Sequence, residues 1–162
     1  MTEAEPTLDL IGAAALAIGA AVGAVLGLEP SDAAALNVVL AEPGLSIRGL
    51  SHVLGLSHSA TVRVADRLQL QGLITRNWAG PGRTMALEIT DRGRQRALGT
   101  VARRTQVLQR ATSGLTAAQR QSLTSLLQKV VLNLADDQAA IDRACRLCDQ
   151  QRCIARGCPL PA

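Results

Sequence analysis

Aromatic residues are almost missing from this chain of 162 residues, which contains no Phe or Tyr and has Trp78 as its single aromatic side chain. Pockets that depend on aromatic stacking are therefore not expected. Aliphatic residues supply nearly all of the 48% hydrophobic fraction, which is large enough for the packed core of one domain. At this length we expect no large additional domain.

Basic residues are absent from residues 1–47, which contain six acidic side chains and no Lys or Arg. Residues 48–110 contain eleven Arg and only three acidic residues, so the positive charge is concentrated in the middle of the chain. A basic segment between non-basic ends is typical of a module that binds a polyanion. A solvated arginine-rich surface would give the same charges, so the function has to be argued from motifs.

Charge is also absent from Leu10 to Leu28, a segment long enough to cross a bilayer. Its glycines repeat at the small-xxx-small spacing of close helix pairs, at Gly19, Gly23 and Gly27. However, Ala and Gly contribute little transfer energy, the flanks are acidic and no basic segment precedes it. We predict a buried helix of a cytoplasmic protein, packed at a dimer interface and not in a membrane. A membrane-tethered or scaffold interaction protein is the alternative.

Helix-capping residues divide the next segment into short helices. Ser31 is the predicted N-cap of a helix that runs to about Leu40, and Ser46 and Ser57 are predicted to cap two more. Gly55 ends the helix that precedes Ser57, because glycine readily adopts a positive φ. Two short helices joined so tightly predict a helix-turn-helix. The second helix should bury one stripe of residues: Thr61, Val64, Ala65 and Leu68.

A small β-hairpin and long helices are predicted after Gly72, which closes the second helix. Two β-like runs, 73–78 and 83–89, flank the turn-forming residues 79–82. A helix then starts at Thr90, with a predicted buried line formed by Leu98, Val101, Thr105 and Leu108. A capping box at Thr116 and Gln119 begins an amphipathic helix that could run into the cysteine segment. The predicted fold is mainly α with a small β-hairpin wing.

The segment from Leu56 to Ile74, LSHSATVRVADRLQLQGLI, resembles the recognition helix and following strand of the MarR family of bacterial regulators. A second pattern resembles that family's wing and the helix start beyond it, with Arg83, Leu87, Ile89, Thr90 and Gly93. The resemblance implies a transcriptional regulator, a repressor and not an enzyme, that acts as a homodimer on a pseudo-palindromic operator in double-stranded DNA. Such a dimer must hold its recognition helices about 34 Å apart, one turn of DNA.

This resemblance implies three parts: an N-terminal dimerisation helix (1–30), a winged helix-turn-helix DNA-binding domain (31–90) and long C-terminal dimerisation helices (91–144). A fourth part, a cysteine-rich tail that we expect to bind a metal or cluster (145–162), is not a general feature of the family.

Residues of the recognition helix and wing are the predicted DNA contacts. Arg63 can bond a guanine edge bidentately, Val62 can contact a thymine methyl group, and Arg83 at the wing can enter the minor groove. At the helix N-terminus three polar residues can bond phosphates or base edges: Ser57, His58 and Ser59. Three further arginines are expected at phosphates: Arg48, Arg67 and Arg76.

All four cysteines lie in one short stretch, as Cys145, Cys148, Cys153 and Cys158. In a cytosolic protein this clustering predicts a metal or redox site, because structural disulfides are rare there. We favour an iron-sulfur cluster over a structural zinc ion, with a metal-free thiol-disulfide switch third. Neighbouring arginines are expected to lower the thiol pKa values. The site would modulate DNA affinity, or the chain could instead be a thiol-based redox protein. The sequence identifies no small-molecule effector.

Overall fold

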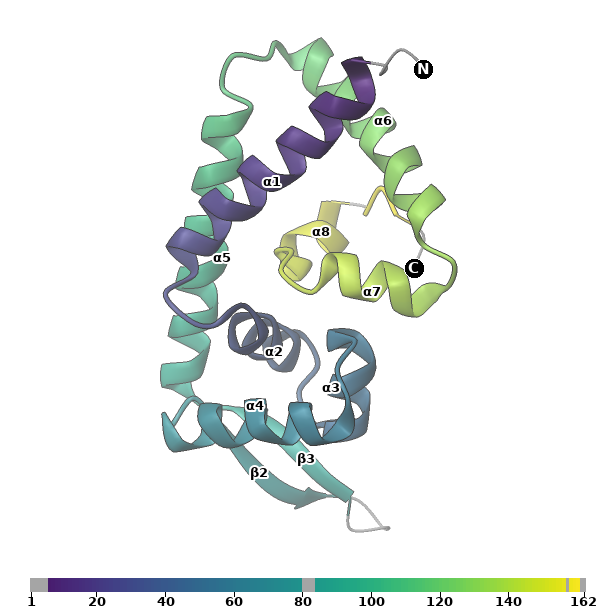
Figure 1. The fold of residues 1–162 in the computed structure, drawn as a ribbon. Coiled ribbons are helices and arrows are strands. Elements are labelled where there is room, and N and C mark those ends of the chain that lie inside the picture. Colours follow the sequence, from purple (N-terminus) through teal and green to yellow (C-terminus); the bar gives the residue numbers. More distant parts are fainter. Residues whose placement is uncertain (1–5, 80–83, 157, 161–162) are drawn as a thin grey trace.

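The structure, a computed structural model, describes residues 6–79, 84–156 and 158–160. Figure 1 shows α5 (Asp91–Ala111) along one side of the molecule, with the other elements arranged beside it. At one end lie α2 (Pro30–Ala41), α3 (Ile47–Leu54), α4 (His58–Leu70) and the strands β1 (Leu45–Ser46), β2 (Ile74–Ala79) and β3 (Thr84–Ile89). The remaining helices are α1 (Pro6–Leu26), α6 (Ala117–Leu134), α7 (Gln138–Cys145) and α8 (Gln150–Arg156). The predicted fold, mainly α with a small β-sheet, is confirmed.

Helix α2 forms the centre of the lobe made by α2–α4 and the sheet. Every residue of α2 from 32 to 40 is buried, and the helix packs against α3, α4, α5 and β3. The largest fully buried side chains of this core come from five different elements: Leu36, Leu50, Leu68, Ile74 and Leu87. Burial of aliphatic side chains therefore holds the helix-turn-helix and the sheet together as one unit.

The predicted helix-turn-helix caps are confirmed. The Ser46 hydroxyl accepts a hydrogen bond from the Gly49 amide at 3.1 Å, and the Ser57 hydroxyl accepts one from the Ala60 amide at 3.2 Å. Gly55 lies between the two helices with φ of 65°. The stripe predicted to be buried on α4 is also the buried one. Helix α4 is thus oriented by local capping and by one apolar face.

The predicted N-cap of α2 at Ser31 is wrong. The helix begins at Pro30, with Glu29 as the N-cap and no side-chain cap bond. Proline suits the first helical position because its missing N–H would have no helical partner there.

The sheet has three antiparallel strands in the order β1-β3-β2, and β1 was not predicted. Strands β2 and β3 pair from Ile74 opposite Ile89 to Ala79 opposite Thr84, and Leu45 of β1 lies opposite Leu87. The first predicted hairpin strand, 73–78, was placed one residue too early, and the second ends at Ile89 as predicted. A strand of two residues has no periodicity that a sequence pattern could reveal.

The buried line predicted on α5 is only partly correct. Ala97, Thr100 and Val101 are buried, whereas the side chain of Leu98 is 48% exposed. The small residues on the Ala97 face let α5 approach α1 and α2 closely, and this turns Leu98 away from them.

The chain turns sharply after α6, so the predicted continuous helix into the cysteine segment is wrong. Helix α6 ends at Leu134, and the Asp137 carboxylate caps α7 by accepting a hydrogen bond from the Ala140 amide at 2.8 Å. Helix α7 then packs against α3 of the lobe, and α7 and α8 lie between that lobe and α6 (Figure 1). The cysteines are therefore brought back to the lobe.

Helix α1, predicted to be buried, buries only Leu26 within this chain. It packs along α5 and leaves several large apolar side chains exposed. By length and composition α1 could cross a membrane, and it is the one such helix among the described residues.

Candidate nucleic-acid interface and cysteine cluster

The N-terminus of α4 presents the three predicted polar residues at the surface. Ser57, His58 and Ser59 are all exposed, and the Ser57 and Ser59 hydroxyls lie 3.2 Å apart. A helix N-terminus carries unpaired backbone N–H groups and a partial positive charge, both of which favour phosphate. The structure thus places these residues where a DNA backbone could reach them.

Arg63 lies one turn farther along the same helix. Its side chain is exposed, and within the part of the chain that the structure describes no hydrogen bond or ion pair holds it. Val62 beside it is half-buried, and Arg48 on α3 is exposed. The Arg63 guanidinium, which has no such bond to any described residue, is therefore available to bind another molecule. The contacts predicted for these residues remain predictions.

Arg67, on the same helix, has a partner within the lobe. Its guanidinium bonds both carboxylate oxygens of Asp32, with Nε 3.1 Å from Oδ2 and Nη2 2.5 Å from Oδ1. The Asp32 side chain is only 3% exposed, whereas that of Arg67 is 44% exposed. Hydrogen bonding to Asp32 raises the pKa of Arg67 above its ordinary value. Arg67 therefore connects the recognition helix to α2, besides any phosphate contact it makes.

Arg76 also has partners within the lobe. Its Nη2 lies 2.7 Å from an Asp66 carboxylate oxygen and 3.3 Å from the Val62 carbonyl oxygen, and its side chain is 18% exposed. These bonds fasten β2 to α4 and leave little of Arg76 for a phosphate. Arg83, predicted at the wing, lies outside the described residues.

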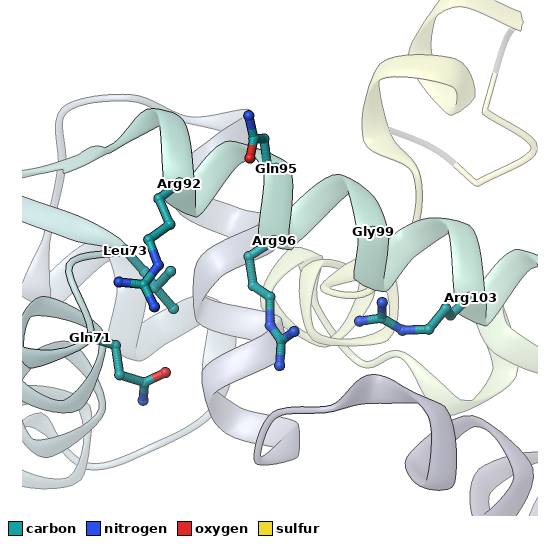
Figure 2. A pocket seen from close by; sticks show the side chains of 7 residues that line it. All are labelled: Gln71, Leu73, Arg92, Gln95, Arg96, Gly99 and Arg103. Carbon is teal, nitrogen blue, oxygen red and sulfur yellow. The ribbon is translucent and has the colours of Figure 1, made fainter.

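A polar pocket of about 480 Å³ lies between α5 and the end of α4, as Figure 2 shows. It is lined by Gln71, Leu73, Arg92, Gln95, Arg96, Gly99 and Arg103. Arg103 Nε and Nη2 donate to the carbonyl oxygens of Val25 and Leu26, at 2.7 and 3.1 Å, and Arg96 donates to that of Gly27. These carbonyls end α1, where cations favour the helix dipole. The two arginines therefore fasten α1 to α5.

The four cysteines come from α7, α8 and the segments that follow these helices. Cys145, Cys148 and Cys153 are half-buried, Cys158 is exposed, and all four are free thiols. Among the thiols, Cys148 acts most strongly on the pKa of Cys145, and Cys158 acts most strongly on that of Cys153. In residues 6–79, 84–156 and 158–160, no three His, Cys, Asp or Glu side chains converge closely enough to hold a metal ion. The thiols therefore form two neighbouring pairs.

Burial, which is the largest cause, and the neighbouring thiols together raise the pKa of Cys145 and of Cys153 to about 11. The expected lowering by nearby arginines is wrong for these two. Three of those arginines have other partners: Arg143 lies 3.9 Å from an Asp137 carboxylate oxygen, Arg152 lies 3.4 Å from one of Asp149, and Arg146 donates to the Arg143 carbonyl.

A helix-turn-helix followed by an antiparallel hairpin defines the class: this is a winged helix-turn-helix protein. A family model described as MarR family matches residues 26–83. The predicted winged-helix fold is thereby confirmed, and the predicted resemblance to the MarR family is confirmed for residues 26–83.

Solved structures of low sequence identity share this fold. A MarR-family transcriptional regulator from Rhodococcus sp. RHA1 is 21% identical with a TM-score of 0.65, over 80% of this chain and 97% of that chain. A MarR family protein from Bacillus stearothermophilus is 18% identical with a TM-score of 0.71, over 80% and 93%. MepR, a transcription regulator of the Staphylococcus aureus multidrug efflux pump MepA, is 15% identical with a TM-score of 0.67, over 78% and 96%. No curated protein sequence matches the chain.

Proposed function

We propose that this protein is a cytoplasmic transcriptional repressor that binds a pseudo-palindromic operator as a homodimer, with one α4 in each of two successive major grooves. The observation that carries the proposal is the exposed Arg63 on α4, a helix whose opposite face is buried in the lobe. Arginine on such a helix can read a guanine through its O6 and N7 atoms. The exposed polar N-terminus of α4 would position the helix on phosphates.

Binding to duplex DNA tests this proposal directly. Fluorescence anisotropy with operator duplexes selected from a random library should give an affinity that falls as salt rises. Arg63→Ala should weaken operator binding by about 1–3 kcal/mol, or roughly 5- to 150-fold, and should relax base preference at one position. Arg94→Ala is the matched control, since it removes the same charge from an exposed site on α5. Equal loss in both variants would contradict a specific role for Arg63.

Exposed apolar side chains on α1 and α6 support the proposed dimer. They include Leu8, Leu10, Leu16, Leu126, Leu127 and Leu134. Gly12, Gly19 and Gly23 have nothing within 4 Å of the position that a Cβ would occupy, so this face is open to close approach. Apolar patches of this kind usually mark an interface.

Sedimentation of the purified chain tests the dimer. We expect a dimer that Gly19→Leu weakens, because the larger side chain would separate the packed helices, whereas Gly114→Ala in the turn before α6 should leave it intact. Recovery of the protein in the membrane fraction would instead favour the tethered interaction protein.

We also propose that the four cysteines hold an iron-sulfur cluster or a zinc ion that modulates DNA affinity. Four soft thiol donors suit either group in kind and number, and the two thiol pairs lie within electrostatic reach of one another. A bound group would require the pairs to converge and the thiols to lose their protons. When bound, a cluster would supply redox sensitivity, whereas zinc would supply structural order alone.

An ultraviolet-visible spectrum with metal and sulfide analysis of anaerobically purified protein distinguishes the two groups. A coloured sample with iron and sulfide supports a cluster, whereas a colourless one with zinc supports the ion. If Cys148→Ser bound the operator and responded to oxidant or chelator as the parent does, the sensor proposal would fail.

A further inference from the structure

The loop from Cys145 to Cys148 is fastened to the interior of the DNA-binding lobe by one side chain. Asn37 of α2 is 5% exposed, and its Nδ2 donates to the carbonyl oxygens of Arg146 and Cys148, at 3.0 and 2.9 Å. Both bonds join residues more than a hundred positions apart in the chain. A buried amide is costly without partners, and this one finds its partners in the cysteine loop.

Side-chain packing places the same loop on the turn of the helix-turn-helix. Leu147 packs against the lobe core, where it shares a small pocket with Leu54 and Leu56 at the end of α3. The aliphatic part of Arg143, at the end of α7 just before the loop, lies against Gly55, and a Cβ at Gly55 would lie only 2.6 Å from Arg143 Cδ. The loop thus contacts the residues that set the angle between α3 and α4.

Helix α2 connects this loop to the recognition helix. Asn37 bonds the loop, and Asp32, five residues earlier, bonds Arg67 of α4. The two side chains leave α2 about 7.5 Å apart along its axis, and both are buried. A displacement of the loop therefore has a short, packed route to α4.

We propose that Asn37 is the positioning residue of the four-cysteine site and that it links the state of that site to the recognition helix through α2. The inference rests on the proposed function, in which the thiols bind a metal or cluster. By holding two carbonyls of the loop, Asn37 orients the backbone that carries Cys145 and Cys148. Loss of a residue that orients metal ligands typically weakens metal binding by about 10- to 100-fold.

Titration of the reduced, metal-free protein with Co²⁺ tests the positioning role. The thiolate-to-cobalt absorption bands report coordination, and competition with a chelator gives the affinity. Asn37→Leu keeps the branching of the side chain at Cγ and removes its donors, so we expect Co²⁺ affinity to fall by about 10- to 100-fold. Asn133→Leu, the same substitution at an exposed position of α6, should bind as the parent does.

Hydrogen exchange of the metal-free protein gives a second measurement that needs no ligand. Backbone amides of residues 143–150 should exchange faster in Asn37→Leu than in the parent or in Asn133→Leu. If Asn37→Leu fails to fold by circular dichroism, Leu147→Ala takes its place in both measurements, because it loosens the same loop by removing its packing against the lobe core. Co²⁺ should also change the operator affinity of the parent, and this change should vanish in Asn37→Leu.

The two proposals can fail separately. If Asn37→Leu matched the parent in Co²⁺ affinity and in exchange, the positioning role would be overturned. A parent that binds no Co²⁺ would overturn the proposed metal site, and unchanged exchange in the variant would then overturn the role of Asn37 in fastening the loop. Co²⁺ binding without any change in operator affinity would overturn the link to α4.

Discussion

Replacing Arg67 by alanine should destabilise the DNA-binding lobe, although the residue lies on the recognition helix and half of its side chain is exposed. The substitution removes both hydrogen bonds to the Asp32 carboxylate and leaves that charge in the core with its side chain only 3% exposed. Arg63→Ala is the matched control, because it removes the same side chain one turn away at an exposed site without an ion pair in the described chain.

The expected size follows from the burial of the pair. Leaving one partner of a buried ion pair unpaired costs about 3–5 kcal/mol, whereas exposed pairs contribute about 0.2–1 kcal/mol. Since water reaches Arg67 but not Asp32, the lower part of the buried range applies, and we expect a loss of about 3 kcal/mol. Arg63→Ala should change the free energy of unfolding by less than about 0.5 kcal/mol.

Urea denaturation followed by circular dichroism measures both variants, and operator titration separates stability from DNA contact. Replacing Asp32 as well, in Asp32→Ala with Arg67→Ala, should recover part of the loss because no buried charge remains. If Arg67→Ala kept the stability of the parent and lost only operator affinity, Arg67 would be a DNA contact alone and the argument from the buried pair would be refuted.

Three other perturbations have definite expected outcomes. Gly93→Ala places a Cβ 1.9 Å from a backbone carbonyl oxygen and should lower the free energy of unfolding, measured by urea denaturation, by at least about 3 kcal/mol. Gly99→Ala has 3.5 Å of space for its Cβ and should raise the free energy of unfolding by roughly 0.5–1 kcal/mol. Equal effects of the two substitutions would contradict the steric argument. The pKa values of Cys145 and Cys153 are raised to about 11, so the alkylation of these thiols in metal-free protein should accelerate about tenfold per pH unit from pH 8 to 10. The folded state should also lose stability as the pH rises from about 9 to 11. An alkylation rate, measured by mass spectrometry, that reaches a plateau near pH 8 would be inconsistent with the raised pKa values. Thr116→Ala removes the capping box of α6 and should lower the free energy of unfolding by about 1 kcal/mol, measured by thermal denaturation, with Ser122→Ala inside the helix as the comparison that should change less.

The candidate DNA surface could be predicted from the sequence to the extent that it depends on α4 alone. The order of exposed and buried positions on that helix follows from its period, so Arg63 was correctly placed on the open face. Arg67 and Arg76 were predicted as phosphate contacts and not as partners of Asp32 and Asp66, because nothing near them in the sequence reveals Asp32 at 35 positions away or the packing of β2 against α4.

Short-range interactions by themselves determined the caps at Ser46, Ser57 and Thr116 and the left-handed turn at Gly55, since each needs only atoms a few residues apart. Tertiary structure alone decided which residues act on the cysteines. It returned α7 to the lobe, aligned the buried amide of Asn37 with two carbonyls of the loop, and raised the thiol pKa by burial where the neighbouring charges in the sequence indicated the opposite. Desolvation and long-range hydrogen bonds depend on what the fold brings together, and no local pattern contains that information.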